Sequence, residues 1–193
     1  MRHFLIIFDD IPIDKISVKS GNNSPEVITA TRCVNVGLFI SGNLRRDVVV
    51  SLAKGTPEDL KIISFPGASL KRVSPDERSI SFFLMKALSI AEELLMDSFK
   101  IMDNGIEVRR SNLKNFCESL TTTNVYISTP GNTSNFTGVA ENENSLLIYS
   151  TGNQLDSFQI DAKWTQVKLP YFPHPERFIL EVNMIVDKTT SCL

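Results

Sequence analysis

Short apolar runs alternate along the chain with longer segments in which apolar residues recur every three or four positions. The short runs are rich in β-branched and aromatic residues, which predicts strands at residues 3–8, 47–53, 60–65, 125–128, 145–149 and 166–169. The periodic segments predict amphipathic helices at about 25–39, after Pro75, from Ser111 and at about 175–188. Strands that alternate with helices predict an α/β fold with a mostly parallel sheet flanked by helices.

The clearest helix start lies in the segment Ser74-Pro75-Asp76-Glu77. Ser74 can cap the helix, and Pro75 suits the first helical position because its missing N–H would have no partner there. Glu77 can accept a hydrogen bond from the backbone of the cap. We therefore expect Ser74 to be the N-cap of this helix.

Basic residues gather at the edges of the predicted elements. They precede the strand at 47, surround the helix start near 74 and follow residue 108, and they include Arg45, Arg46, Arg72, Arg78, Arg109 and Arg110. Arginine forms paired hydrogen bonds with phosphate groups, so an anionic ligand is one interpretation. Solvated surface charge is the other, because most such runs are no more than that.

Length and charge limit the class of protein. A chain of 193 residues with 42% hydrophobic and 22% charged residues can form one domain with a full core, and we expect a single domain over residues 1–193. The net charge is −2, so any binding of nucleic acid must depend on local basic patches. No apolar run is long enough to predict a transmembrane helix.

Cysteine and histidine usage points to a cytoplasmic protein without a metal site. Cys33, Cys117 and Cys192 are widely spaced and form no Cys-x-x-Cys pair, which is typical of a reducing compartment. His3 and His174 have no partners at the spacing of metal ligands. His174 is either a surface loop residue or a contact to a bound ligand.

Several common catalytic motifs are absent. No two glycines stand two residues apart, which excludes the G-x-G-x-x-G loop of dinucleotide-binding domains. The chain also has neither the phosphate-binding G-x-x-x-x-G-K-[ST] motif nor a G-x-S-x-G nucleophile elbow. A cofactor, if there is one, must be bound by loops of another kind.

Several segments match a known family in order and spacing over about residues 1–128. They are Met1-Arg2-x-Phe4, Arg32-Cys33-Val34, Leu38-Phe39-Ile40-Ser41, Arg45-Arg46-Asp47-Val48, the stretch from Leu70 to Arg78, Lys86-Ala87-Leu88 and Gly105-Ile106-x-Val108-Arg109-Arg110. With these segments the chain resembles the archaeal-type tRNA pseudouridine-54 N1-methyltransferases of the SPOUT superfamily.

The resemblance implies a fold, a reaction and partners. It implies a SPOUT-type α/β fold with a C-terminal trefoil knot, a cytoplasmic homodimer, and S-adenosylmethionine as cofactor. The implied reaction methylates N1 of pseudouridine 54 in the T-loop of tRNA, and the six arginines named above become candidates for RNA contact. Asp47 and Asp76, each beside arginines, either orient an arginine in an ion pair or steer the N1 proton; the catalytic base is otherwise unknown.

The family's cofactor pocket is built from three loops in the last third of the chain. The resemblance places candidate cofactor contacts on these loops, at Ile127, Ser150, Gly152, Leu169, Tyr171 and Phe172. The second loop here reads Ser150-Thr151-Gly152-Asn153 where the family usually has Gly-Asp-His.

The third loop reads Leu169-Pro170-Tyr171-Phe172-Pro173-His174 where the family usually has Leu-Ser-Leu-Ser-Pro-Leu. Its prolines lack amide donors. Two hypotheses follow from these departures: a methyltransferase that holds the cofactor through backbone groups, or a non-catalytic RNA-binding relative with a degenerate pocket. A SPOUT enzyme that acts on a different RNA is a third.

Overall fold

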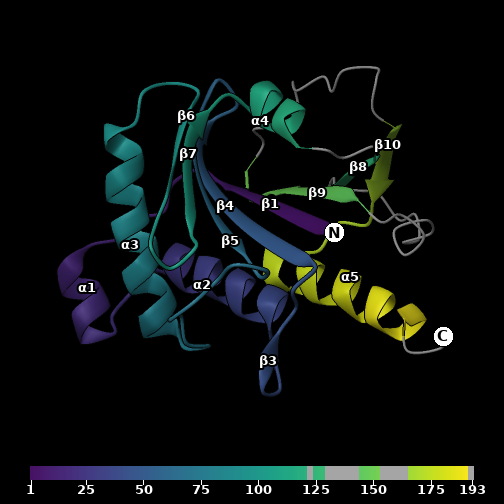
Figure 1. The fold of residues 1–193 in the computed structure, drawn as a ribbon, viewed down its shortest axis with the longest axis horizontal. Coiled ribbons are helices and arrows are strands. Elements are labelled where there is room, and N and C mark those ends of the chain that lie inside the picture. Colours follow the sequence, from purple (N-terminus) through teal and green to yellow (C-terminus); the bar gives the residue numbers. More distant parts are fainter. Residues whose placement is uncertain (121–123, 129–143, 153–164, 191–193) are drawn as a thin grey trace.

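The computed structural model describes residues 1–120, 124–128, 144–152 and 165–190 (Figure 1). Within these residues, the main sheet has the strand order β10-β8-β9-β1-β4-β5-β7-β6, and β2 pairs with β3 in a small hairpin. The strands are β1 (Arg2–Phe8), β2 (Phe39–Ile40), β3 (Asn43–Leu44), β4 (Val48–Thr56), β5 (Asp59–Pro66), β6 (Ser98–Ile101), β7 (Glu107–Ser111), β8 (Asn124–Ser128), β9 (Ser145–Ser150) and β10 (Thr165–Leu169). The helices are α1 (Lys15–Ser20), α2 (Pro25–Leu38), α3 (Glu77–Glu93), α4 (Leu113–Ser119) and α5 (Pro175–Thr190).

The sheet changes from parallel to antiparallel at β4. The adjacent pairs β10–β8, β8–β9, β9–β1 and β1–β4 are parallel, whereas β4–β5, β5–β7 and β7–β6 are antiparallel. Only Pro57 and Glu58 separate β4 from β5, which is too short for the crossover that a parallel pair needs. The predicted mostly parallel sheet is therefore confirmed, with an antiparallel extension on one side.

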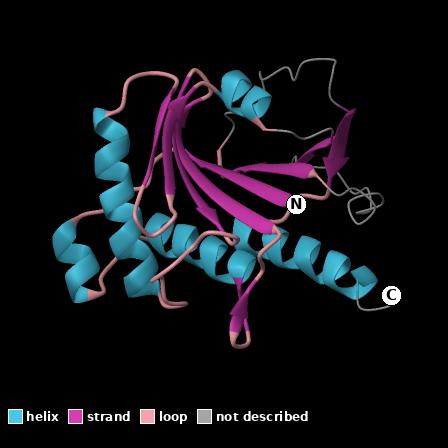
Figure 2. Ribbon diagram, in the orientation of Figure 1, coloured by secondary structure: helices cyan, strands magenta, loops and turns pink. Residues whose placement is uncertain are grey.

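Helices cover both faces of the sheet (Figure 2). Phe4, Ile6 and Phe8 of β1 belong to the larger core, which also contains residues of α2, α3 and α5. Leu5 and Ile7 point to the other face and pack with residues of α4. Because β1 is buried on both faces, its residues from Phe4 to Phe8 are continuously apolar rather than alternating.

The predicted elements are confirmed where the apolar pattern is long or continuous. All six predicted strands are present, as β1, β4, β5, β8, β9 and β10, and the four predicted helices are α2, α3, α4 and α5. The pattern missed the short strands β2 and β3 as well as β6, β7 and α1. In β6, two of four residues are exposed apolar side chains, and β7 carries two arginines, so neither shows the burial pattern from which a strand is predicted.

The predicted cap of α3 is wrong. The N-cap is Asp76, whose side chain accepts a hydrogen bond from the Ser79 backbone N–H at 2.8 Å. The backbone N–H of Ser74 instead donates to the Ser79 hydroxyl, and Pro75 lies outside the helix. Asp76 therefore caps the helix in place of Ser74, two residues earlier, and the two residue types are about equally good N-caps.

A buried arginine ties the C-terminal helix to the centre of the sheet. Arg2, only 6% exposed, donates to Asn183 and Asp187 of α5 at 3.0 and 3.3 Å and to Asp47, just before β4, at 2.7 Å. Arg45 holds the other oxygen of Asp187 at 2.8 Å. Since α5 follows the predicted third loop directly, this network also positions that loop.

Candidate functional site

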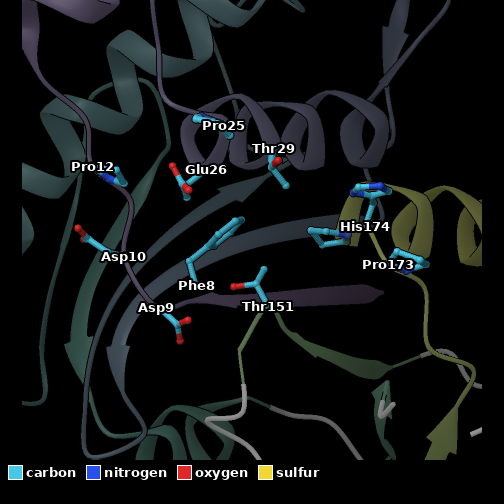
Figure 3. A pocket seen from close by; sticks show the side chains of 11 residues that line it. Phe8, Asp9, Asp10, Pro12, Pro25, Glu26, Thr29, Thr151, Pro173 and His174 are labelled. Atoms are coloured by element: carbon cyan, nitrogen blue, oxygen red, sulfur yellow. The ribbon is translucent and has the colours of Figure 1, made fainter. Parts of the chain in front are cut away.

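A cavity of about 520 Å³ lies where β1 and β9 end and α2 and α5 begin (Figure 3). These two strands are parallel neighbours, so their carboxyl ends open at the same edge of the sheet, where α/β proteins usually bind ligands. The lining residues are Phe8, Asp9, Asp10, Pro12, Pro25, Glu26, Thr29, Thr151, Pro173, His174 and Pro175.

The loop after β9 is fixed against the end of β1. The Thr151 backbone N–H donates to the Ile7 carbonyl at 2.9 Å, and the Ser150 hydroxyl donates to the Gly152 carbonyl at 2.9 Å. A Cβ at position 152 would overlap both carboxylate oxygens of Asp9, so glycine there allows the Asp9 carboxylate to lie directly on this loop.

The start of α2 forms the opposite wall of the cavity. Ser24 caps the helix by accepting a hydrogen bond from the Val27 N–H at 3.3 Å, and Pro25 occupies the first turn. This start places Glu26 and Thr29 one turn apart, and both reach from α2 toward the cavity (Figure 3).

The cavity is acidic. Among the residues described as lining it, Asp9, Asp10 and Glu26 are carboxylates and none is lysine or arginine. Lys54 lies 3.5 Å from Asp10 but also contacts Glu92 at 3.3 Å, so it offsets only part of this charge. The hydroxyls of Thr29 and Thr151 and the His174 ring add neutral hydrogen-bonding groups.

Two of the three predicted cofactor loops reach the cavity, through neighbours of the predicted residues. The second loop contributes Thr151 and the third contributes Pro173 and His174; residues 129–131 of the first loop and 153–154 of the second lie outside the described residues. His174, which the sequence left open between a surface residue and a ligand contact, is exposed and lines the cavity.

None of the six predicted cofactor residues lines the cavity. Ile127 and Leu169 are buried core residues, and Ser150 and Gly152 bond to each other. The Tyr171 ring stacks on Tyr149 with centroids 5.5 Å apart, and the Tyr149 hydroxyl donates to the Phe172 carbonyl. Burial raises the pKa of Tyr149 far above its usual value, so this hydroxyl remains a donor.

The two predicted catalytic carboxylates do not line this cavity. Asp47 pairs with Arg2 at 2.7 Å, and Asp76 caps α3. Although partial burial opposes it, the bond and charge of Arg2 hold the pKa of Asp47 below its usual value. An orienting ion pair is thus present at Asp47, but with Arg2 rather than with the adjacent arginines.

The six predicted RNA-binding arginines divide by their partners. Arg45 bonds to Asp187, and Arg110 donates to both oxygens of Asp59 at 2.8 and 2.7 Å. This bidentate bond lowers the pKa of Asp59 and raises that of Arg110.

Within the described residues, the remaining four arginines contact carbonyl oxygens or aromatic rings rather than carboxylates. Arg46, Arg72 and Arg78 are exposed and donate to the carbonyls of Gly67, Asp103 and Lys19. Arg109 lies over the rings of Phe99 and Phe116 at 5.2 and 6.0 Å. A guanidinium group that makes one hydrogen bond within the protein still has several other N–H donors. These four arginines can therefore also bind phosphate.

Sequence reasoning missed the three carboxylates of the cavity. Asp9 and Asp10 directly follow the predicted strand at 3–8, and Glu26 lies in the predicted helix at about 25–39, but none of the three was a candidate site residue. The available signal was an acidic pair directly after a fully apolar strand, since polar residues at that position fall on the ligand-binding edge of a parallel sheet.

In the described part of the chain, no group of three or more His, Cys, Asp or Glu residues is placed to hold a metal ion. No helix among these residues has the length and hydropathy that spanning a bilayer requires.

Curated relatives match part of the chain. The protein named tRNA (pseudouridine(54)-N(1))-methyltransferase of Methanocaldococcus jannaschii is 43% identical over 88 residues, which cover 44% of this chain and 43% of the relative. Its namesake from Natronomonas pharaonis is 31% identical over 122 residues, or 62% of this chain and 60% of the relative. The matches therefore span less than two thirds of these relatives.

A family model covers more of the chain. The family described as SAM-dependent RNA methyltransferases matches residues 1–151, which includes every described element from β1 to β9. The match includes Asp9, Glu26 and Thr151, which line the cavity, and it ends before the third loop. On this match, the chain belongs to the SAM-dependent RNA methyltransferase family.

Proposed function

We propose that the protein uses S-adenosylmethionine to methylate N1 of pseudouridine 54 in the T-loop of tRNA. The cavity at the carboxyl edge of β1 and β9 carries the proposal, because the second and third predicted cofactor loops meet there in a chain of the SAM-dependent RNA methyltransferase family. The reaction and the tRNA substrate are those in the names of the curated relatives.

The lining residues fit this cofactor. A volume of about 520 Å³ falls within the usual range of small-molecule sites. The cofactor carries positive charge on its sulfur and its amino group, which Asp9, Asp10 and Glu26 can complement, and its hydroxyls and adenine can bond to Thr29, Thr151 and His174. When bound, S-adenosylmethionine supplies an electrophilic methyl group.

The protein's own residues must position the nucleobase and hold its N1 proton. Asp9 and His174 line the cavity and can each accept a proton there. Asp47 and Asp76 stay predicted candidates for the same task from outside the cavity. Phe8 and the prolines of the cavity wall limit the access of water to a base held beside Asp9 or His174.

The predicted cofactor residues take supporting positions in this proposal. Ser150 and Gly152 shape the loop that presents Thr151, and Ile127 and Leu169 hold the ends of β8 and β10 in the core. Tyr171 and Phe172, packed with Tyr149, fix the third loop just before Pro173 and His174, which line the cavity.

The finer features of the fold and assembly are also proposals. We infer one domain over residues 1–193, a trefoil knot in its C-terminal third, a homodimer and a cytoplasmic location. The position of β9 between β8 and β1 in the sheet and the packing of α5 against α2 support the proposal of a knot. Leu180 and Met184, exposed on α5 at 40% and 42%, offer apolar surface to a second copy.

Methyl transfer can be measured by mass spectrometry. We expect tRNA that carries pseudouridine at position 54 to gain one trideuteromethyl group on that nucleoside when it is incubated with the protein and deuterated cofactor. The matched control is tRNA with uridine 54, which has no free N1–H and should gain none. Binding of tRNA without methylation would contradict the proposal and favour the non-catalytic relative, and methylation elsewhere would indicate a different target.

The same assay separates the two classes of arginine. Arg46→Ala should raise KM for tRNA and lower the slope of log KM against log salt by about one, since one phosphate contact is lost. Arg110→Ala should leave this slope unchanged, because its guanidinium is held by Asp59. An unchanged slope in the Arg46 variant would remove this residue from the RNA contact surface.

A further inference from the structure

We propose that a basic groove along α3 binds unpaired nucleotides of the RNA substrate, and that Arg72, Lys86 and Asn104 form a site for one of its phosphate groups. The groove consists of two neighbouring cavities that share Lys86 and Met102. The inference rests on the proposed function, because it assigns a second surface to the same RNA. It adds Lys86 and Asn104, which were not candidate site residues, to the RNA contacts.

The cavity at the ends of β1 and β9 offers no cationic side chain to RNA. Among its described lining residues, none is lysine or arginine. Binding of nucleic acid depends largely on contacts between cationic side chains and phosphates. A protein that brings a nucleotide of tRNA to this cavity therefore needs cationic side chains on another part of its surface.

The smaller cavity of the basic groove lies between α3 and the turn that joins β6 to β7. Its volume is about 250 Å³, and its lining residues are Arg72, Phe83, Lys86, Met102, Asp103 and Asn104. This volume is below the usual range for sites that hold a whole small molecule. It suits one group of a larger ligand, such as a single phosphate, whose remainder lies outside the cavity.

The two cationic side chains of this cavity keep donors for a ligand. Arg72 is exposed and donates to the Asp103 carbonyl at 3.2 Å, which leaves other N–H groups on its guanidinium. The Lys71 backbone N–H donates to the Asn104 carbonyl at 2.9 Å and fixes Arg72 beside the turn. Lys86 reaches the same cavity from the middle of α3.

Asn104 contributes a donor that lacks an acceptor. The residue is only 5% exposed, and its Oδ1 accepts a hydrogen bond from the Ile106 N–H at 3.4 Å. Its Nδ2 is buried and has no hydrogen-bond partner among the described residues. A buried amide group without a partner is unfavourable. A phosphate oxygen that enters the cavity between Arg72 and Lys86 would supply the missing acceptor.

The carboxylates of the groove do not cancel its positive charge. Asp14 caps α1 and accepts hydrogen bonds from two backbone N–H groups of its first turn, at 2.7 and 3.0 Å. Asp103 is exposed and stays a negative charge in the turn. Against these two stand Lys15, Arg72 and Lys86. Cations therefore outnumber carboxylates among the described lining residues, which favours an anionic ligand.

An exposed aromatic ring lies one turn before Lys86 on α3. Phe82 is 40% exposed, and the Lys86 Nζ lies 4.4 Å from the centre of its ring. Between α1 and α3, which lie side by side (Figure 1), Phe82 also lines a further cavity with Lys19 and Arg78. Exposed aromatic rings stack on unpaired RNA bases. Cationic and aromatic groups thus follow one another along α3, as single-stranded RNA requires.

Titration of fluorescently labelled tRNA, without cofactor, tests the inference. Binding is followed by anisotropy at several salt concentrations. The Arg72→Gln, Lys86→Gln double variant should bind tRNA roughly tenfold more weakly, and the slope of log Kd against log salt should fall by about 0.7, because one phosphate contact is lost. Asn104→Asp keeps the acceptor for the Ile106 N–H but removes the donor, and it should also weaken binding.

Two further variants separate charge from stacking. Lys114→Gln is the matched control, because Lys114 is exposed on α4, which packs on the other face of the sheet. It should keep the wild-type affinity and slope. Phe82→Leu should weaken binding severalfold without changing the slope, because stacking involves no counterion release.

The outcomes separate the inference from the proposed function. Wild-type affinity and slope in the double variant, or an equal loss in Lys114→Gln, would overturn the groove as an RNA site while tRNA methylation by the wild type persists. A fully paired RNA duplex that binds as tightly as tRNA would overturn the assignment to unpaired nucleotides. Absence of tRNA binding by the wild type would overturn both proposals. Loss of affinity and slope in the double variant, with the control unchanged, supports the inference.

Discussion

Acidification from pH 7 to about pH 4 should cost the wild-type protein about 3 kcal/mol of folding free energy more than it costs a His3→Gln variant. His3 is 5% exposed, and its Nε2 lies 2.7 Å from the Ser51 hydroxyl, which lies 2.6 Å from that of Ser64. Burial, followed by the charge of Arg109, lowers the pKa of His3 from 6.5 to about 4.

The sign of the effect follows from proton binding. Above pH 6.5 the imidazole is neutral in both states, and the full stability is present. Between pH 6.5 and about 4 the unfolded chain binds a proton that the folded protein excludes, so stability falls as the pH falls. Urea unfolding of both proteins across this range measures the difference, and parallel pH dependences in the two would show that His3 does not cause it.

Replacing Gly67 by alanine should destabilise the fold by about 3 kcal/mol. Gly67 is buried between β5 and the segment that precedes β4, and its N–H donates to the Val48 carbonyl at 2.9 Å. A Cβ there would overlap the Arg45 carbonyl and lie 3.0 Å from that of Val48. Backbone must move to accept it, which would also displace Arg46, bonded to the Gly67 carbonyl at 2.9 Å.

Gly42→Ala is the matched control for this substitution. Gly42 has a positive φ of 74°, but no atom lies within 4 Å of a Cβ built there, so alanine brings only conformational strain of about 1 kcal/mol. Denaturant midpoints of the two variants should differ accordingly. If Gly67→Ala proved no more harmful than Gly42→Ala, close approach of the backbone at Gly67 would not be important for stability.

The sequence predicted the parallel half of the fold well because burial on both faces leaves a continuous apolar run. The run from Phe4 to Phe8 is such a case, with apolar neighbours on both sides of the sheet. The apolar pattern did not predict β6, in which Phe99 and Ile101 are more than half exposed. There the pairing with β7, and not the pattern of the strand itself, determines the structure.

The candidate site was only partly predictable for a similar reason. Thr151 and His174 lie in loops that the resemblance indicated. Asp9 and Glu26 line the same cavity only because β1 ends, and α2 begins, at the same edge of the sheet. The partner of Arg45 was equally hidden, since Asp187 is 142 residues away along the chain. Sequence neighbours suggested Asp47, which pairs with Arg2 instead.

The location of the methyl donor is tested most directly by amide chemical shifts. On addition of S-adenosylmethionine, the largest changes should occur at Asp9, Thr151 and His174, which come from three separate segments and share the cavity. Changes centred instead on the groove lined by Met85, Lys86 and Ser89 of α3, or no changes at millimolar ligand, would contradict the account. The methyl donor would then not bind in the cavity at the ends of β1 and β9.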